Sequence, residues 1–174
     1  MIKYFLTAIL FALAINPAFA EDDQLAEKAF KIYYHAKDSG QYEKAYKMFA
    51  PDYKNDFLLD KFKSVVEDFN KKSGPVKERK INKISWVDNP PGGQGALEGK
   101  YAAVDFMGRF EKINKYCGYI IFRQSSTGEL QVVREEENSM DNETEKQIVK
   151  KSSQQKADDA WRVLSSACPN YTAN

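Results

Sequence analysis

Apolar residues recur at helical spacing along the first part of the chain. Between Gln24 and Lys37 they fall at steps of three and four residues, which predicts an amphipathic helix that Gly40 ends with a left-handed cap. A second, short helix is predicted between Tyr42 and Pro51. A third helix, capped by Asp52 and ending before Ser73, is predicted from apolar residues that share one face between Phe57 and Phe69.

From residue 76 the apolar spacing changes to the two-residue period of strands. Residues 76–87 predict a first strand with imperfect alternation, in which Arg79, Ile81 and Lys83 share one side. A glycine- and proline-rich loop follows, and it lacks the spacing of a phosphate-binding motif. Three more strands are predicted over residues 101–110, 116–123 and 130–136, and the short turns between them make neighbouring strands antiparallel.

The strand at residues 101–110 has one apolar face and one mixed face. Asp105 and Arg109 lie on the mixed face, and the core face consists of Ala102, Val104, Phe106, Gly108 and Phe110. One more helix is predicted over residues 143–168 and ends at Pro169. We therefore expect an α+β fold, in which N-terminal helices pack on a curved antiparallel sheet of about four strands, followed by a C-terminal helix.

The first twenty residues have the layout of a secretory signal peptide. Lys3 provides the positive start, residues 4–15 are almost all apolar, and residues 18–20 read Ala-Phe-Ala. A membrane-spanning helix needs roughly 20 apolar residues, so this stretch is too short for an anchor. We expect cleavage after Ala20, a periplasmic or secreted location, and no membrane span in the mature chain. The remainder divides into a domain at residues 21–138 and a helical extension at residues 139–174.

Charge and cysteine content narrow the classes of partner. Removal of Lys3 from the 26 basic side chains leaves 25, equal to the number of acidic ones, so nucleic acid is not an expected partner. Cys117 and Cys168 both lie in the exported part, which predicts a disulfide; two buried free thiols are the alternative. Zinc needs three or four ligands, and His35 has none nearby in sequence, so we expect neither metal nor cofactor.

Several short motifs, in their order and spacing, resemble a family of secreted bacterial proteins known as domain of unknown function 4019. They are Asp38–Tyr42, Ala45-Tyr46, Gly74 with Arg79, Pro91 with Gly99–Tyr101, Val104–Phe106 with Phe110, and Gly128 with Leu130 and Val132. The resemblance covers about residues 25–134. It departs at Leu130, where the family has tryptophan, and at Arg134-Glu135, where it has Gly-Tyr; the final helix and both cysteines are extra. It implies a cone-shaped sheet similar to nuclear transport factor 2 and cystatin, and no particular activity.

Related cone folds include isomerases and dehydratases with acidic residues and tyrosines in the pocket. On that resemblance Asp105 is the candidate base, and Tyr101, Tyr116 or Tyr119 would donate a hydrogen bond to a developing oxyanion. The alternative is that Asp105 and Arg109 are solvated, or paired with a neighbouring strand. We favour this structural alternative, because no further converging titratable groups are evident.

Other charged residues have two interpretations each. Arg79 would bind an acidic ligand through two hydrogen bonds, or would brace Asp38 or a helix C-terminus, and we favour the brace. Together with Tyr101 and Arg109, it forms the set of candidate binding residues. Residues 135–137 are three consecutive glutamates, and consecutive strand residues point to opposite faces, so we expect a solvated strand end and not a cation site.

These observations predict an exported cell-envelope protein without catalytic activity. It would bind a small amphipathic ligand in the concave side of the sheet, or a partner protein of the envelope. An isomerase- or hydratase-like enzyme that uses Asp105 and a tyrosine is the alternative. A third reading is an assembly subunit that forms a homodimer through the sheet.

Overall fold

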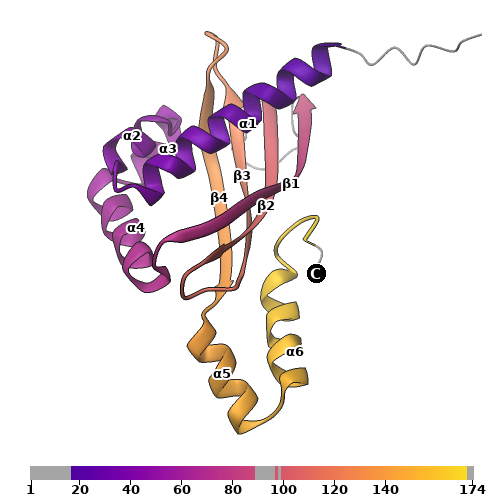
Figure 1. Ribbon diagram of the computed structural model, residues 1–174. Helices are drawn as coiled ribbons and strands as arrows, with labels where there is room; N and C mark the ends of the chain where they lie inside the picture. The colour runs from indigo at the N-terminus through magenta and orange to yellow at the C-terminus, as the bar shows by residue number, and fades with distance from the viewer. Residues whose placement is uncertain (1–16, 89–96, 98, 172–174) are drawn as a thin grey trace, which may run out of the picture.

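The computed structural model describes residues 17–88, 97 and 99–171. In this part of the chain, four helices precede four strands, and two more helices follow (Figure 1). The helices are α1 (Pro17–Asp38), α2 (Tyr42–Lys47), α3 (Pro51–Asp56), α4 (Leu59–Ser73), α5 (Asn142–Lys151) and α6 (Gln154–Ser165). The strands are β1 (Val76–Asp88), β2 (Lys100–Phe110), β3 (Lys115–Gln124) and β4 (Leu130–Met140).

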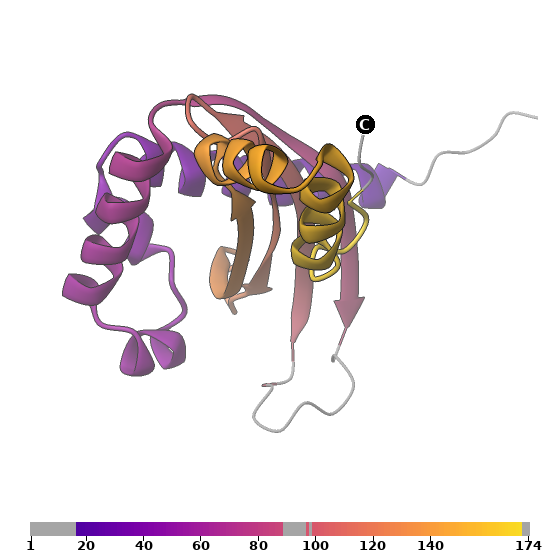
Figure 2. The same cartoon turned by 90° about the horizontal axis from the view of Figure 1, so that it is seen from below.

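The four strands form one antiparallel sheet in the order β1-β2-β3-β4. The sheet is curved, and α1 to α4 lie on its concave side, while α5 and α6 form a hairpin at one end (Figures 1 and 2). The α+β fold expected from the sequence is therefore confirmed. Helix α5, the first helix after the sheet, begins two residues after Met140.

The main core fills the space between the helices and the concave face. On β2 the expected core face is confirmed, because Ala102, Val104, Phe106 and Phe110 are at most 1% exposed. Aromatic rings supply much of the filling; Tyr34, for example, lies 5.0 Å from Phe106 between ring centroids. Gly40 has a φ of 74° and ends α1 as predicted, with its N–H donating to the carbonyl of Lys37.

The predicted third helix is in fact two helices. Phe57 and Leu58 have extended backbone angles and separate α3 from α4. The break lets the Phe57 ring pack 6.2 Å from Phe49 and 6.0 Å from Phe62, a position that a continuous helix would not give it. Pro51 also has a different role, since it begins α3 at the first helical position, where its missing N–H is harmless.

The predicted C-terminal helix is likewise divided, at residues 152–153. Ser153 caps α6, and its side chain accepts a hydrogen bond from the Lys156 backbone N–H at 3.3 Å. The result is a hairpin of two short helices. Its α6 side packs against β3 and β4.

Both edge strands contain β-bulges that change which residues face the core, and β1 has two of them, at Lys77 and at Asn82. In β1 the pairing shifts by one residue between Ile81 and Lys83, so that Asn82 is the extra residue. Ile81 and Ile84 therefore both pack on the main core, which explains the imperfect alternation of the sequence. In β4 the extra residue is Val133.

The predicted signal peptide lies mostly outside the described residues, which begin at Pro17. Cleavage after Ala20 would remove the first turn of α1, and from Glu21 onward the first buried core residue of that helix is Ala26. Within the described part of the chain, none of the helices combines the length and the apolar character needed to cross a membrane.

Candidate functional site

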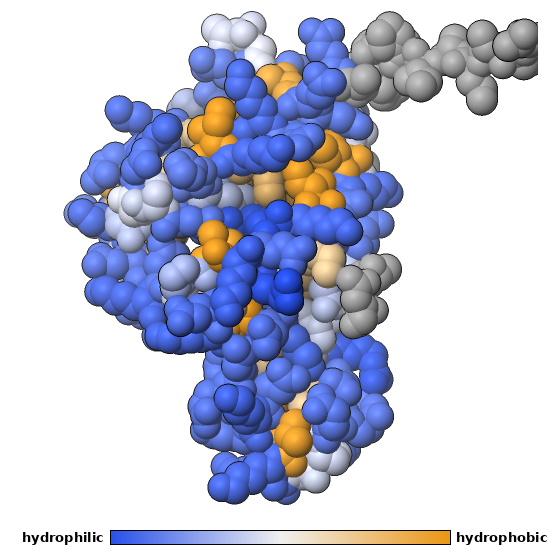
Figure 3. All heavy atoms as spheres, viewed as in Figure 1, coloured by the Kyte–Doolittle hydropathy of each residue, from blue (hydrophilic) through white to orange (hydrophobic). Residues whose placement is uncertain are grey.

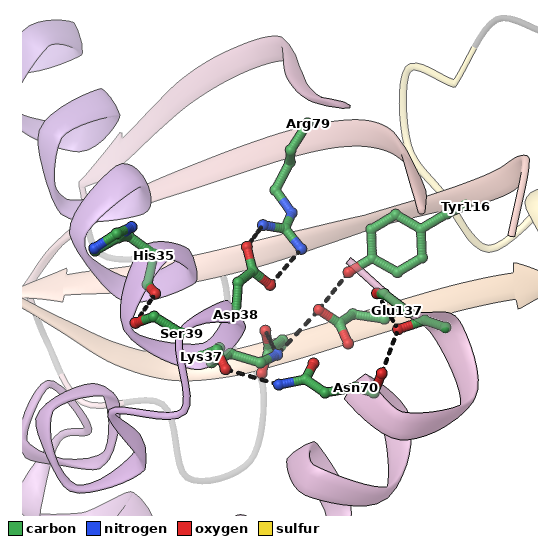
Figure 4. A network of polar contacts seen from close by, with 11 residues as sticks. His35, Lys37, Asp38, Ser39, Asn70, Arg79, Tyr116 and Glu137 are labelled. Atoms are coloured by element: carbon green, nitrogen blue, oxygen red, sulfur yellow. Dashed lines mark hydrogen bonds and ion pairs between the residues drawn. The ribbon is translucent and has the colours of Figure 1, made fainter. Parts of the chain in front are cut away.

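A buried ionic cluster joins the end of α1 to β4. The Lys37 ammonium lies 2.6 Å from a carboxylate oxygen of Glu135 and 3.1 Å from one of Glu137 (Figure 4). Only 7% of the Lys37 side chain is exposed, against 15% for Glu135 and 23% for Glu137. We call this group, together with the Tyr33 and Tyr116 phenols, the lysine cluster.

The bulge at Val133 creates this cluster. Beyond Val132, which faces the core, strict alternation would turn Arg134 inward; the extra residue turns Glu135 and Glu137 inward instead. The prediction of a solvated strand end was therefore wrong. The three glutamates do not converge, as expected, but two of them meet on the ammonium group of Lys37.

Two phenols and an amide complete the lysine cluster. Tyr33 donates to Glu135 at 2.8 Å, and Tyr116 donates to Glu137 at 2.6 Å. The Asn70 side chain of α4 donates to the Lys37 carbonyl at 2.9 Å. The network thus connects α1, α4, β3 and β4, and it places Tyr116 inside the core.

Mutual attraction determines the protonation of the cluster. Burial opposes the charge on Lys37, but the two glutamates outweigh it and raise the pKa of the ammonium. For Glu137 burial is outweighed by Lys37 and by the Tyr116 hydrogen bond, so its pKa is lowered. Burial dominates at Glu135 and raises its pKa, because Lys37 is shared with a second carboxylate. The cluster is a hydrogen-bonded ion network in which the ammonium is buried and the two carboxylates are partly buried.

Arg79 lies close to this cluster and is also paired. Its two terminal nitrogens both donate to the carboxylate of Asp38, with 3.1 Å between Nη2 and Oδ1. The guanidinium also lies 4.2 Å from the centroid of the Tyr34 ring. Its side chain is 9% exposed. The structure confirms the expected brace to Asp38. Both terminal nitrogens of the guanidinium are therefore already hydrogen-bonded, and the group is buried.

Asp105 lies on the opposite face of the sheet and is covered by the segment after α6. It is 4% exposed, and the Asn170 side chain donates a hydrogen bond to it. Burial raises the pKa of Asp105, although Asn170 and nearby Lys83 act in the other direction. Asp105 pairs across the sheet with Tyr119, whereas Tyr116 points to the core. Of Tyr116 and Tyr119, only Tyr119 lies on the same face of the sheet as Asp105.

The remaining candidates are separated from one another. Tyr101 is 8% exposed and donates to the carbonyl of Leu97. Burial and the Glu136 carboxylate raise the pKa of Tyr119 to about 12. Arg109 is exposed and donates to Glu78 of β1 at 2.8 Å and 3.1 Å. Arg79, Tyr101 and Arg109 therefore do not form one site.

Arg109 does belong to a groove that the residue pattern did not predict. This groove, of about 1040 Å³, lies between the outer face of β1 and β2 and the helix α6. Its wall includes Glu78, Lys80 and Met107 from the sheet and Trp161 from α6. The surface seen in Figure 3 is mainly hydrophilic, with separate small hydrophobic areas. The groove shares this mixed character.

A second, smaller core holds the groove in shape. Cys117 and Cys168 form the predicted disulfide, with an S–S distance of 2.07 Å and 6.0 Å between their Cα atoms. They pack with Met140 and Trp161, and we call these four residues the extension core. The Trp161 indole also donates to the Tyr171 hydroxyl at 2.9 Å. The disulfide therefore fixes α6 opposite the sheet.

A polar anchor lies at one end of the groove. Lys115 of β3 lies 2.9 Å from Glu145 of α5 and 3.1 Å from Asp158 of α6. All three residues line the groove, and the pairs hold both helices of the hairpin to the sheet. In the described residues, acidic, histidine and cysteine side chains form no group of three that would hold a metal ion.

Comparison with known proteins gives one match. Residues 29–134 match the model of a family described as protein of unknown function (DUF4019), and the chain belongs to this family. No curated protein and no solved structure matches the chain. The matched region ends before α5, α6 and Cys168, so the α6 wall of the groove lies outside it, and of the extension core only Cys117 lies inside it.

Proposed function

We propose that this is an exported, non-catalytic protein of the cell envelope that binds a partner protein in the groove between the sheet and α6. The observation that carries the proposal is the position of the groove in the fold. The groove has a volume of about 1040 Å³, on the side of the sheet away from α1 to α4. It is lined by apolar and charged side chains together, as protein interfaces commonly are.

The concave side of the sheet gives less support to a small amphipathic ligand. Its aromatic side chains already fill the interior, with Tyr34, Phe106 and Tyr116 each at most 2% exposed. A ligand there would have to displace well-packed rings, which is costly in a close-packed core. The groove needs no such rearrangement.

Export is supported by two features of different kinds. The sequence begins with a stretch typical of a cleaved leader, and the two cysteines of the chain are disulfide-bonded. Disulfides persist in oxidising compartments and are rare in the cytosol. We therefore place the mature protein, from Glu21 onward, in the periplasm or outside the cell.

An enzyme built on Asp105 and Tyr119 is the second candidate. It is favoured by their direct cross-strand pairing and by the raised pKa of Asp105. A substrate would first have to move Asn170 away from the carboxylate. In an activity screen of isomerase and hydratase substrates, the native protein and Asp105→Asn should be equally inactive; turnover that Asp105→Asn abolishes would support the enzyme.

Site-specific crosslinking in the producing cell tests the groove. A photo-reactive benzoylphenylalanine replaces Arg109 in the groove, and in a matched control strain it replaces Lys71 on α4. Both positions carry an exposed cation of an ion pair, with 58% and 69% of the side chain accessible. Illumination followed by mass spectrometry should give one recurrent protein adduct at position 109 and none at position 71. Equal labelling at both positions, or no adduct at 109, would refute the proposal.

A further inference from the structure

β1 has an open hydrogen-bonding edge. Only β2 pairs with it among the described residues, so the backbone groups on its other side have no strand partner. The opposite edge of the sheet differs, because the Val132 N–H of β4 donates to Met48 at 2.8 Å and its carbonyl accepts from Ala50 at 2.9 Å. With 13 residues, β1 is also longer than a typical strand of about 5–6 residues.

Three lysines line this edge strand and form no salt bridge with the described residues. Lys77, Lys80 and Lys83 are exposed, and no carboxylate of the described residues lies within ion-pair distance of them. Most other cations on the sheet are paired; Arg109 and Arg123, for example, contact Glu78 and Asp52. The edge therefore combines backbone groups that have no strand partner with exposed positive charge, of which only that of Lys83 is partly offset by its cross-strand neighbour Asp105.

The lysines oppose pairing with a second copy of the chain. In a two-fold antiparallel pairing centred on Lys80, the Lys80 side chains of the two copies would lie opposite each other. Like charges opposite each other destabilise a strand pair, and lysine is common on edges that must not self-associate. The same side chains would stabilise an added strand that carries acidic residues at alternate positions.

We propose that β1 receives an extended, acidic segment of a partner protein as a fifth strand of the sheet. Backbone hydrogen bonds would provide affinity, and contacts with the lysines would select acidic sequences. Glu78 and Lys80 belong both to this edge strand and to the groove wall, so the two surfaces are continuous. The inference rests on the proposed function, since it names the chemistry of the partner that the groove binds.

Labelled peptides of one length test the choice of partner. The probes are a ten-residue peptide of alternating glutamate and valine, its lysine–valine counterpart, and a glutamate–valine peptide methylated at every backbone nitrogen, which cannot donate along either edge. Fluorescence anisotropy at low salt should detect binding of the unmethylated glutamate–valine peptide alone. Hydrogen exchange should show slower exchange of β1 amides in the complex, with β3 amides unchanged.

Matched charge reversals test the lysines. Lys80→Glu combined with Lys83→Glu should weaken binding of the glutamate–valine peptide by roughly tenfold or more, from the loss of two cross-strand charge pairs and the gain of repulsion. Lys63→Glu combined with Lys71→Glu on α4 makes the same change in net charge at exposed positions on the helical side. This control should leave binding within about twofold.

Several outcomes would overturn the inference. Equal affinity for the acidic and basic peptides, unchanged exchange at β1, equal loss in both double variants, or no binding at all would each do so. Sedimentation that shows a native dimer lost in the Lys80/Lys83 variant would assign the edge to a second copy instead. The crosslink at position 109 would survive all these failures if the groove is the binding site, whereas its absence would refute the proposed function itself.

Discussion

Lys37 places a full positive charge inside a core made largely of aromatic rings. Its position was not evident from the sequence, where it is one lysine among many near a helix end. The cluster depends on contacts between residues about 100 positions apart, which no local pattern records. The partner of Arg79 was easier to predict, because an isolated arginine at the start of a strand indicates an acidic partner nearby. Asp38 was one of the two partners expected, together with a helix C-terminus.

Replacement of Lys37 by methionine should be strongly destabilising. The change leaves Glu135 and Glu137 close together and without a cation, and breaking a buried ion group in this way typically costs about 3–5 kcal/mol. Urea denaturation followed by circular dichroism gives the free energy of unfolding. Lys31→Met is the control, since that side chain is 69% exposed and should change stability by less than about 0.5 kcal/mol. A loss below about 1 kcal/mol for Lys37→Met would contradict the ionic role.

The same cluster should make the protein sensitive to alkali. Burial raises the pKa of Tyr33 and Tyr116 above the ordinary value of 10.0, and the glutamates raise that of Lys37 above 10.5. Below pH 10 these groups are protonated in both states, so their contribution is fully present. Above it the unfolded chain releases protons that the folded chain retains, so stability falls.

Denaturation midpoints measured between pH 8 and pH 12 check this expectation. The midpoint should stay level up to about pH 9.5 and then decrease. Tyr33→Phe should reduce the steepness of that decrease, because the folded chain then retains one phenol proton fewer than the native protein does. A midpoint that is constant through pH 11.5 would show that the phenols are not protected.

At the scale of the element, strand and helix types followed well from the residue pattern, but their interruptions did not. The core face of β2 was predicted residue by residue, because its alternation is regular. In β4 the extra residue Val133 reverses the alternation, and nothing in the local sequence marks it. In β1 the irregular order of Ile81, Lys83 and Ile84 was such a mark, and the bulge at Asn82 explains it.

A one-residue insertion in β4 tests the control that the bulge exerts. An alanine inserted between Arg134 and Glu135 would turn Glu136 toward the core and move Glu135 and Glu137 to the outer face, so Lys37 would lose its partners. We expect an unfolded or insoluble product by circular dichroism and size-exclusion chromatography. Deletion of Val133 is the control, because it removes only the extra residue and leaves Glu135 and Glu137 at the core positions, so this variant should still fold. A folded insertion variant with native-like stability would show that the register of β4 can adapt.

At the scale of the whole molecule, two cores share one sheet. The main core lies on the concave side, and the extension core lies on the other side around the disulfide. The sequence predicted both the bond and its link between β3 and the C-terminal helical region. It did not predict the groove, because the groove arises from the turn at residues 152–153 that folds α6 back toward the sheet.

Removal of the disulfide should loosen the extension before the rest. The bond spans 51 residues, which corresponds to roughly 4 kcal/mol of chain entropy in the unfolded state. In the Cys117→Ala/Cys168→Ala variant, limited proteolysis should cut within residues 141–171 first and leave a resistant fragment that ends near Met140. The oxidised native protein under the same conditions is the control. Simultaneous loss of both parts would mean that the two cores unfold as one unit.

The two edges of the sheet differ in how the chain secures them. β4 is followed by a segment whose far end is covalently joined to β3, so the two strands remain within one closed covalent loop, a disulfide tether, when they separate. β1 has no such tether. Under mechanical tension β1 should therefore separate from the sheet first. A separated β4 should pair again with β3 quickly, so the sheet should unfold from the β1 edge only.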